Sequence, residues 1–85
     1  MAERTATVLA VDDNATIRKA ISMRLGSRGY DVITAADGPG ALAVVKRQRV
    51  DLVLLDLQMP GMRGEEVLQE IRSRFSPTQL PVIML

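Results

Sequence analysis

Four short apolar runs alternate along the chain with segments of helical periodicity, and this alternation restricts the possible folds more than any other feature. The runs are rich in β-branched residues and apolar at successive positions, the pattern of strands covered by helices on both faces. They are TVLAV at 7–11, YDVITAA at 30–36, DLVLLD at 51–56 and LPVIML at 80–85. Strict alternation predicts parallel strands joined by right-handed crossovers. The sequence therefore predicts an α/β protein with an open parallel sheet and helices on both faces.

The three segments between the runs carry helix signals at their ends. Asn14 is a favourable N-cap for the first helix, and Gly29 is a favourable left-handed stop after it. Asp37 can cap the second helix, in which Pro39 suits the first turn. The third helix is predicted over residues 65–75. The residues expected on the buried faces of these helices are Ile17, Ala20, Ile21, Leu25, Ala41, Leu42, Val45, Val67, Leu68, Ile71 and Phe75.

Size and composition limit where the protein acts. With 85 residues the chain can form one small domain, predicted over residues 1–85. Its 47% hydrophobic and 25% charged residues are typical of a globular protein. The start of the chain lacks the layout of a secretory signal, and no apolar run approaches the roughly 18 residues that a membrane span needs. We therefore expect a cytoplasmic protein without membrane contact.

Composition also excludes several kinds of chemistry. A net charge of +1 provides no field to attract nucleic acid, so we expect no nucleic-acid binding by this chain. The chain has neither cysteine nor histidine. Disulfides, zinc sites of the usual ligand types and nucleophiles paired with histidine are therefore excluded. Any chemistry must come from carboxylates.

Acidic residues follow two of the predicted strands. Asp12 and Asp13 come directly after the first strand, and Asp56 ends the third. In open parallel sheets the ligand crevice lies outside the carboxyl ends of the strands, where the strand order reverses. If the first and third strands are neighbours, with the second beyond the first, the three carboxylates converge.

Three carboxylates in one crevice repel one another unless a cation joins them. Ligands that are all oxygen favour Mg²⁺ or Mn²⁺ over zinc or copper. A carboxylate beside Mg²⁺ can act as a nucleophile toward phosphorus and form an aspartyl-phosphate. The acids therefore predict a magnesium site with a nucleophilic carboxylate.

Each acid also has a purely structural interpretation. Asp12 or Asp13 can cap the first helix, Asp51 can be a solvated residue before a strand, and Asp56 can start a turn. These roles explain single acids well. They explain a pair after one strand and a third acid after its neighbour less well, because burying unpaired carboxylates is costly.

Four blocks of the sequence, VLAVDD, GYDVITAADGPGAL, DLVLLDLQMPGM and LPVIML, together resemble the receiver domain of two-component response regulators. The resemblance implies a flavodoxin-like fold with Asp56 as the phosphoacceptor. It implies that Asp12 and Asp13 hold Mg²⁺ directly or through water, together with Asp56 and the backbone carbonyl of Gln58. The implied partner is a sensor histidine kinase or a phosphotransfer protein. Such a protein is a signalling module and not an enzyme that acts on outside substrates.

The resemblance covers only part of the family's fold. Receivers of this family have five strands and five helices, with a hydroxyl residue after the fourth strand and a lysine after the fifth, whereas this sequence runs to Leu85. We therefore expect an incomplete receiver of four strands and three helices. Its fourth strand would be an exposed apolar edge, which invites pairing with another chain. The expected result is self-association.

Other functions remain to be weighed against phosphoacceptance. A truncated receiver can act as a self-associating interaction module without phosphorylation, and magnesium binding would separate the two functions. A magnesium-dependent phosphohydrolase would place a second acid two residues after its nucleophile, where this chain has Gln58. A nucleotide-binding domain would need a glycine-rich loop after the first strand, where this chain has VDDNATIR.

Overall fold

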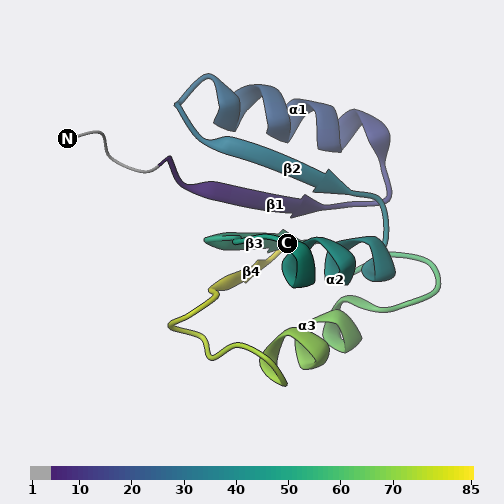
Figure 1. Cartoon of the computed structure of the whole chain (residues 1–85). Helices are drawn as coiled ribbons and strands as arrows, with labels where there is room; N and C mark the ends of the chain where they lie inside the picture. The colour runs from purple at the N-terminus through teal and green to yellow at the C-terminus, as the bar shows by residue number, and fades with distance from the viewer. Residues whose placement is uncertain (1–4) are drawn as a thin grey trace.

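The sheet of the protein has four parallel strands, as predicted. The structure, a computed structural model, describes residues 5–85. The strands are β1 (Thr7–Val11), β2 (Asp31–Ala35), β3 (Leu52–Leu55) and β4 (Val82–Met84), in the order β2-β1-β3-β4 (Figure 1). β1 is paired on both sides, so that Leu9 aligns with Ile33 of β2 and with Val53 of β3. The second strand lies beyond the first, and the chain order therefore reverses between β1 and β3.

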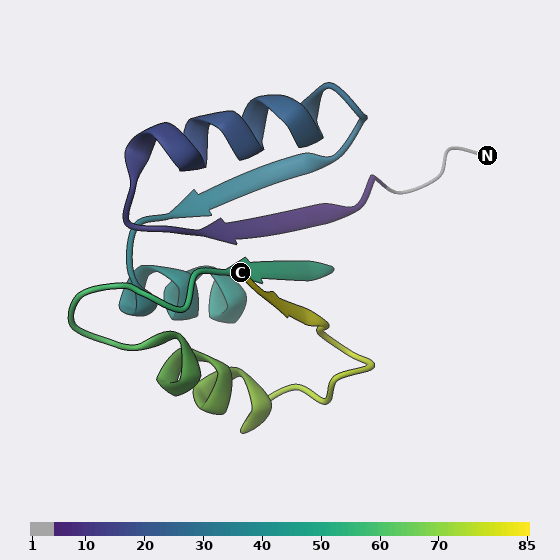
Figure 2. The same ribbon diagram turned by 180° about the vertical axis from the view of Figure 1, so that it is seen from behind.

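Three helices connect the strands and cover both faces of the sheet. They are α1 (Ala15–Gly26), α2 (Gly38–Arg47) and α3 (Gly64–Arg72). α1 lies on one face, and α2 and α3 lie together on the other (Figures 1 and 2). The predicted α/β fold with helices on both faces is thus confirmed. Among residues 5–85, no helix has the length and apolar character needed to cross a membrane.

The predicted helix caps are confirmed. Asn14 Oδ1 accepts hydrogen bonds from the backbone N–H groups of Thr16 and Ile17, at 2.9 and 3.1 Å. Asp37 Oδ1 accepts one from the N–H of Gly40 at 2.7 Å. These bonds satisfy N–H groups that have no partner inside the helix. The two polar residues therefore fix where α1 and α2 begin.

The hydrophobic core lies between the sheet and the pair α2 and α3. The buried residues of this core are Leu9, Val11, Ala35, Ala41, Val44, Val45, Val50, Val53, Leu55, Met59, Val67, Ile71 and Leu80. Alternate residues of β1 and β3 point into it because side chains alternate between the faces of a strand. Full burial of one such side chain stabilises the fold by roughly 1.5–3 kcal/mol. The predicted inward faces of α2 and α3 are confirmed, with Leu42, Leu68 and Phe75 partly buried against the core.

α3 is shorter than the helix predicted over residues 65–75. It ends at Arg72, and the chain then tightens, with the N–H of Arg74 bonded to the carbonyl of Ile71. Arg72 Nη1 also donates to the carbonyl oxygen of Leu80 at 2.7 Å. This bond ties the end of the helix to the segment that enters β4. Phe75 reaches the core from the turn rather than from the helix.

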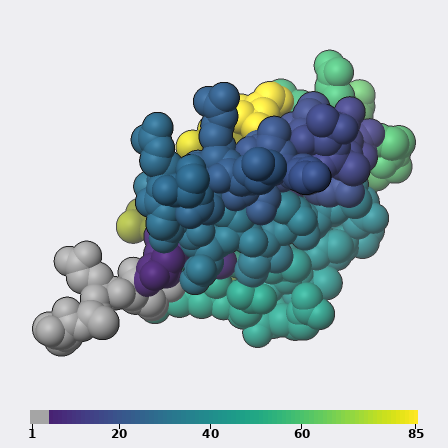
Figure 3. All heavy atoms as spheres, turned by 90° about the horizontal axis from the view of Figure 1, so that it is seen from above, coloured from purple at the N-terminus to yellow at the C-terminus, as the bar shows by residue number. Residues whose placement is uncertain are grey.

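The prediction of a buried face on α1 is wrong for half of its residues. No residue of α1 is buried; Ile17 is 44% exposed, Ala20 is exposed, and Ile21 and Leu25 are half-buried. α1 packs on β2 and β1. On this face no helix of residues 5–85 covers β3 and β4, and part of the C-terminal segment, in yellow, stays in view behind α1 in Figure 3. The apolar side of α1 therefore has only half a sheet to pack against.

Candidate functional site

The ends of β1 and β3 bring the predicted acids to one edge of the sheet. Asp12 directly follows β1, and its N–H donates to the carbonyl of Ala35 at 3.1 Å. Asp56 directly follows β3, and its N–H donates to the carbonyl of Val11 at 3.0 Å. The strand pairing thus continues one residue beyond each strand. Both acids leave the sheet at the edge where the strand arrowheads point in Figure 1.

The structure brings Asp12, Asp13 and Asp56 together. One carboxylate oxygen from each lies within 4.8 Å of the others, and we call these three residues the acid cluster. Asp12 is buried at 6% exposure, Asp56 is half-buried and Asp13 is exposed. The cluster is therefore open to solvent on one side and enclosed by the sheet on the other.

Two of the three carboxylates also accept backbone hydrogen bonds. Asp12 Oδ1 accepts from the N–H of Asn14 at 2.9 Å, and Asp56 Oδ1 accepts from the N–H of Gln58 at 3.1 Å. Asp56 therefore starts a turn, as its structural interpretation expects, whereas the N-cap of α1 is Asn14 and not Asp12 or Asp13. Asp12 and Asp56 each keep a second oxygen for another partner. The side chain of Asp13 accepts no hydrogen bond from residues 5–85.

The donor set of the acid cluster fits Mg²⁺. The available ligands are carboxylate oxygens, the chain has no histidine or cysteine, and Mg²⁺ prefers oxygen. Opposite ligands of Mg²⁺ stand about 4.2 Å apart, twice its usual bond length. Three oxygens that lie within 4.8 Å of one another can hold one such ion directly or through water. Within residues 5–85 no Lys or Arg forms an ion pair with the carboxylates of the cluster.

The loop that joins β3 to α3 begins at Asp56 and extends past the edge of the sheet before it turns back into α3 (Figure 2). Met59 is buried, and Gly64 opens the helix at such close range that a Cβ on it would lie 2.9 Å from the Asp56 carbonyl oxygen. Gly64 is a residue that the sequence analysis missed, because only the folded approach of two backbones reveals the need for glycine. Gln58 is exposed, and the proposed role of its carbonyl stays a prediction.

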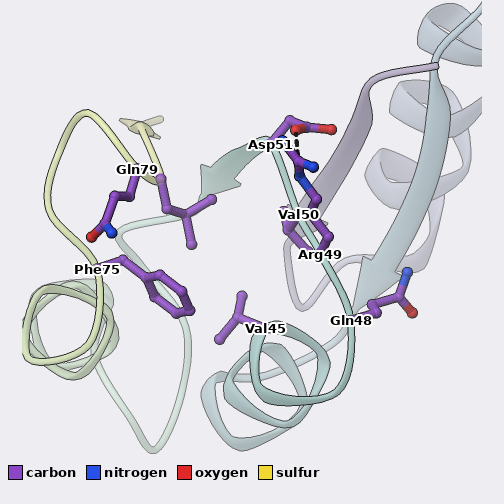
Figure 4. Close-up of a pocket in the computed structure, with 8 residues that line it drawn as sticks. Val45, Gln48, Arg49, Val50, Asp51, Phe75 and Gln79 are labelled. Carbon is purple, nitrogen blue, oxygen red and sulfur yellow. Dashed lines mark ion pairs between the residues drawn. The ribbon is translucent and has the colours of Figure 1, made fainter. Parts of the chain in front are cut away.

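A separate cavity of about 220 Å³ lies at the opposite end of the sheet (Figure 4). Phe75 and Val45 line it beside Asp51, which pairs with Arg49 at 3.7 Å. Asp51 Oδ2 also accepts a hydrogen bond from the N–H of Thr7 at 2.7 Å. Asp51 is therefore a structural residue that holds the start of β1, more than a solvated one, and it does not belong to the acid cluster.

The chain has an acid pair after one central strand and a third acid after the neighbouring strand, and the strand order reverses between them. These features define the class of doubly wound α/β proteins with an acidic ligand site at the carboxyl edge of the sheet. The sequence profile of the response regulator receiver domain matches residues 8–85. The chain therefore belongs to the response regulator receiver domain family, the modules through which two-component systems signal.

A curated relative shows how much of a longer protein the chain resembles. The probable transcriptional regulator ycf27 of Porphyridium aerugineum is 47% identical over 78 residues, which are 92% of this chain and 31% of that protein. The chain spans about a third of the length of the curated relatives it matches. The similarity thus covers the receiver portion of such regulators.

Solved structures show the same fold. The chemotaxis protein CheY4 of Vibrio cholerae matches with a TM-score of 0.89 and 41% identity, over 95% of this chain and 68% of that one. The response regulator TrrA of Thermotoga maritima, in complex with Mg²⁺-BeF, matches with a TM-score of 0.87 and 36% identity, over 94% and 68%. TrrA has also been solved in complex with the histidine kinase ThkA. The resemblance inferred from the sequence is confirmed.

Proposed function

We propose that Asp56 accepts a phosphoryl group from a sensor histidine kinase or a phosphotransfer protein, with Mg²⁺ held in the acid cluster. The observation that carries this proposal is the approach of three carboxylate oxygens within 4.8 Å at the carboxyl ends of β1 and β3. The complexes of TrrA with Mg²⁺-BeF and with ThkA support it, because TrrA shares the fold and 36% of the aligned residues.

The proposed roles combine the positions of the three acids with the resemblance to the receiver family. Asp12 and Asp13 hold Mg²⁺ directly or through water, and Asp56 and the carbonyl of Gln58 complete the protein ligands. When bound, Mg²⁺ neutralises charge on the transferring phosphoryl group. The N–H of Gln58 holds Asp56 Oδ1 at 3.1 Å and thereby fixes the plane of the carboxylate. A nucleophile oriented in this way loses little freedom on reaction.

The proposed reaction is a single displacement at phosphorus. A carboxylate oxygen of Asp56 forms the new bond to phosphorus while the bond from phosphorus to the donor's imidazole nitrogen breaks. The imidazole leaves with the electron pair of that bond, and Asp56 becomes an aspartyl-phosphate. The chain then serves as a signalling module that carries the phosphoryl group and does not turn over an outside substrate.

The setting of this reaction follows from its donor. A phosphohistidine is made from ATP, and we therefore propose that the chain acts in the cytoplasm. We propose that residues 1–85 act as one domain and, because the net charge is only +1, that they do not bind nucleic acid themselves. The relative from Porphyridium aerugineum is named as a transcriptional regulator, but this chain matches only 31% of that protein. We therefore do not extend a role in transcription to this chain.

A second candidate function is a self-associating interaction module that works without phosphorylation. β4 lies at the edge of the sheet and, within residues 5–85, is paired only with β3. Ile83 of this strand is 49% exposed, and Leu85 beside it is 56% exposed. An apolar edge strand with free backbone groups supports pairing with a second copy. Magnesium binding separates the candidates, because only phosphoacceptance needs it.

The test is the intact mass of the chain after incubation with a small phosphoramidate donor. We expect a gain of one phosphoryl group with Mg²⁺, and none when a chelator replaces the metal. The control is Asp56→Asn, which keeps the shape of the side chain and removes the nucleophile. A gain in the Asp56→Asn variant, or no gain in the wild type with Mg²⁺, would refute the proposal and leave the interaction module as the better account.

A further inference from the structure

Arg18 reaches from α1 to the backbone of the acid cluster. Its Nη1 donates a hydrogen bond to the carbonyl oxygen of Asp12 at 2.8 Å, and its side chain is half-buried. A guanidinium usually prefers a carboxylate, with which it forms a bidentate pair. Here the cation nearest in sequence to the cluster binds the main chain and leaves the carboxylate oxygens free. The bond therefore holds the backbone beside the acids and is not an ion pair with their carboxylates.

Asp13 is the member of the cluster whose side chain has the least support from the described part of the chain. Asp12 and Asp56 are each held by a backbone N–H on the carboxylate, whereas the side chain of Asp13 has no such bond within the described part of the chain. The peptide that joins Asp12 to Asp13 is planar. When Arg18 fixes its carbonyl, it also fixes the direction of the Asp13 N–H and restricts where the Asp13 side chain points.

We propose that Arg18 is a positioning residue that keeps the Asp13 carboxylate in the acid cluster by holding the peptide between Asp12 and Asp13. The inference rests on the proposed magnesium site, and it names a residue outside the ligand set on which that site depends. The sequence alone does not predict this role, because no spacing rule predicts a bond from a side chain to a carbonyl oxygen.

Positioning and charge predict opposite effects when Arg18 is replaced. If Arg18 acted only as a cation near the site, its removal would relieve repulsion of Mg²⁺ and tighten binding. If Arg18 holds the peptide, its removal frees Asp13 and weakens binding. The sign of the change therefore distinguishes the two roles.

The experiment is a Mg²⁺ titration of the whole 85-residue chain by calorimetry. Arg18→Gln should raise the dissociation constant about threefold to tenfold, the range expected from the loss of one hydrogen bond. Arg18→Lys keeps the charge and one possible donor, so it should bind between the wild type and Arg18→Gln. Lys19→Gln is the charge-matched control, because Lys19 is exposed on the same helix, and it should bind at least as tightly as the wild type.

A second readout does not need the metal. Without Mg²⁺, the amide NMR signals of Asp13 and Asn14 should shift or broaden in Arg18→Gln and remain unchanged in Lys19→Gln. If the wild type fails to bind Mg²⁺, the proposed site falls, and the amide signals still test the positioning role. If the wild type binds and both Arg18 variants bind as tightly or more tightly, the inference on Arg18 is overturned. If Arg18→Gln does not fold, Arg18→Lys is compared with the wild type alone. A lower affinity for Mg²⁺ supports the inference, and an equal or higher affinity overturns it.

Discussion

The backbone N–H of Asp56 donates a hydrogen bond to the carbonyl oxygen of Val11 at 3.0 Å. This bond extends the pairing of β1 and β3 by one residue, so that Asp56 and the residue after Val11, Asp12, leave the sheet side by side. The bond depends only on the register of two strands, Val11 lying opposite Leu55. The backbone of Asp12 and Asp56 is therefore held by the central strands of the sheet.

Replacement of Asp13 by Asn tests the cluster through stability. Without metal, the variant should unfold at a slightly higher temperature than the wild type, because one of three repelling charges is gone. Added Mg²⁺ at ten times its dissociation constant should stabilise the wild type by about 1.4 kcal/mol. Asp13→Asn should lose most of this gain. The measurement is thermal unfolding followed by circular dichroism, with and without Mg²⁺.

The matched control for that experiment is Asp31→Asn, since Asp31 is an exposed acid at the start of β2 and outside the cluster. It should respond to Mg²⁺ as the wild type does. Equal magnesium responses in Asp13→Asn and the wild type would show that the cluster is not the binding site.

Replacement of Gly64 by Ala tests how tightly the loop closes behind Asp56. The new Cβ would lie 2.9 Å from the Asp56 carbonyl oxygen and 3.0 Å from Leu57 Cα, so backbone must move. We expect a loss of about 1–3 kcal/mol in the free energy of unfolding, typical of overpacking, measured by urea denaturation.

Gly26→Ala is the control for this effect, because a Cβ on Gly26 would meet nothing within 4 Å. Alanine there should stabilise α1 by roughly 0.5–1 kcal/mol. If Gly64→Ala were as stable as Gly26→Ala, this would contradict the close approach of the Gly64 backbone to the backbone of Asp56 and Leu57.

Truncation of Leu9 tests the location of the core. Leu9 is fully buried between the sheet and the pair α2 and α3, and Leu9→Ala should cost about 2–5 kcal/mol. Ile83→Ala removes a similar side chain that is 49% exposed, so it should cost less than about 1 kcal/mol. Urea denaturation of both variants gives the comparison. Similar costs at the two positions would contradict the one-sided core.

Self-association through the edge of β4 can be tested by light scattering over a range of concentrations. The wild type should show a mass above that of the monomer that rises with concentration. Ile83→Lys should lower this mass toward the monomer, because a charge on an edge strand opposes pairing. Met23→Lys is the control, since Met23 is 66% exposed on α1 and away from the edge. A wild type that stays monomeric, or equal effects of both variants, would exclude the β4 edge as the interface.

Local signals in the sequence were sufficient to predict most of the fold. The apolar run at 7–11 became β1 with the same bounds, and the caps at Asn14 and Asp37 lie where the side-chain chemistry places them. The predicted reversal of strand order was enough to bring Asp12, Asp13 and Asp56 together. These features depend on periodicity, capping and topology rules that act on short segments.

Features that depend on long-range packing could not be predicted. Ile17 has the helical spacing of a core residue, yet it is 44% exposed. α1 packs only on β1 and β2, and no other helix of residues 5–85 lies on the same face of the sheet to cover Ile17. α3 ends at Arg72, and the side chain of Arg72 bonds to the carbonyl of Leu80, eight residues away, a contact that no local signal predicts. The approach of Gly64 to Asp56 and the bond from Arg18 to Asp12 likewise exist only in the folded chain.

The central claim is that Asp56 is the phosphoacceptor, and the most direct test locates the modification. The chain is treated with phosphoramidate and Mg²⁺, the acyl phosphate is reduced with borohydride, and the peptides are sequenced by mass spectrometry. The account predicts that homoserine, the product of a reduced aspartyl-phosphate, replaces Asp56 and no other acid. Homoserine at Asp12 or Asp13, with Asp56 unchanged, would contradict it.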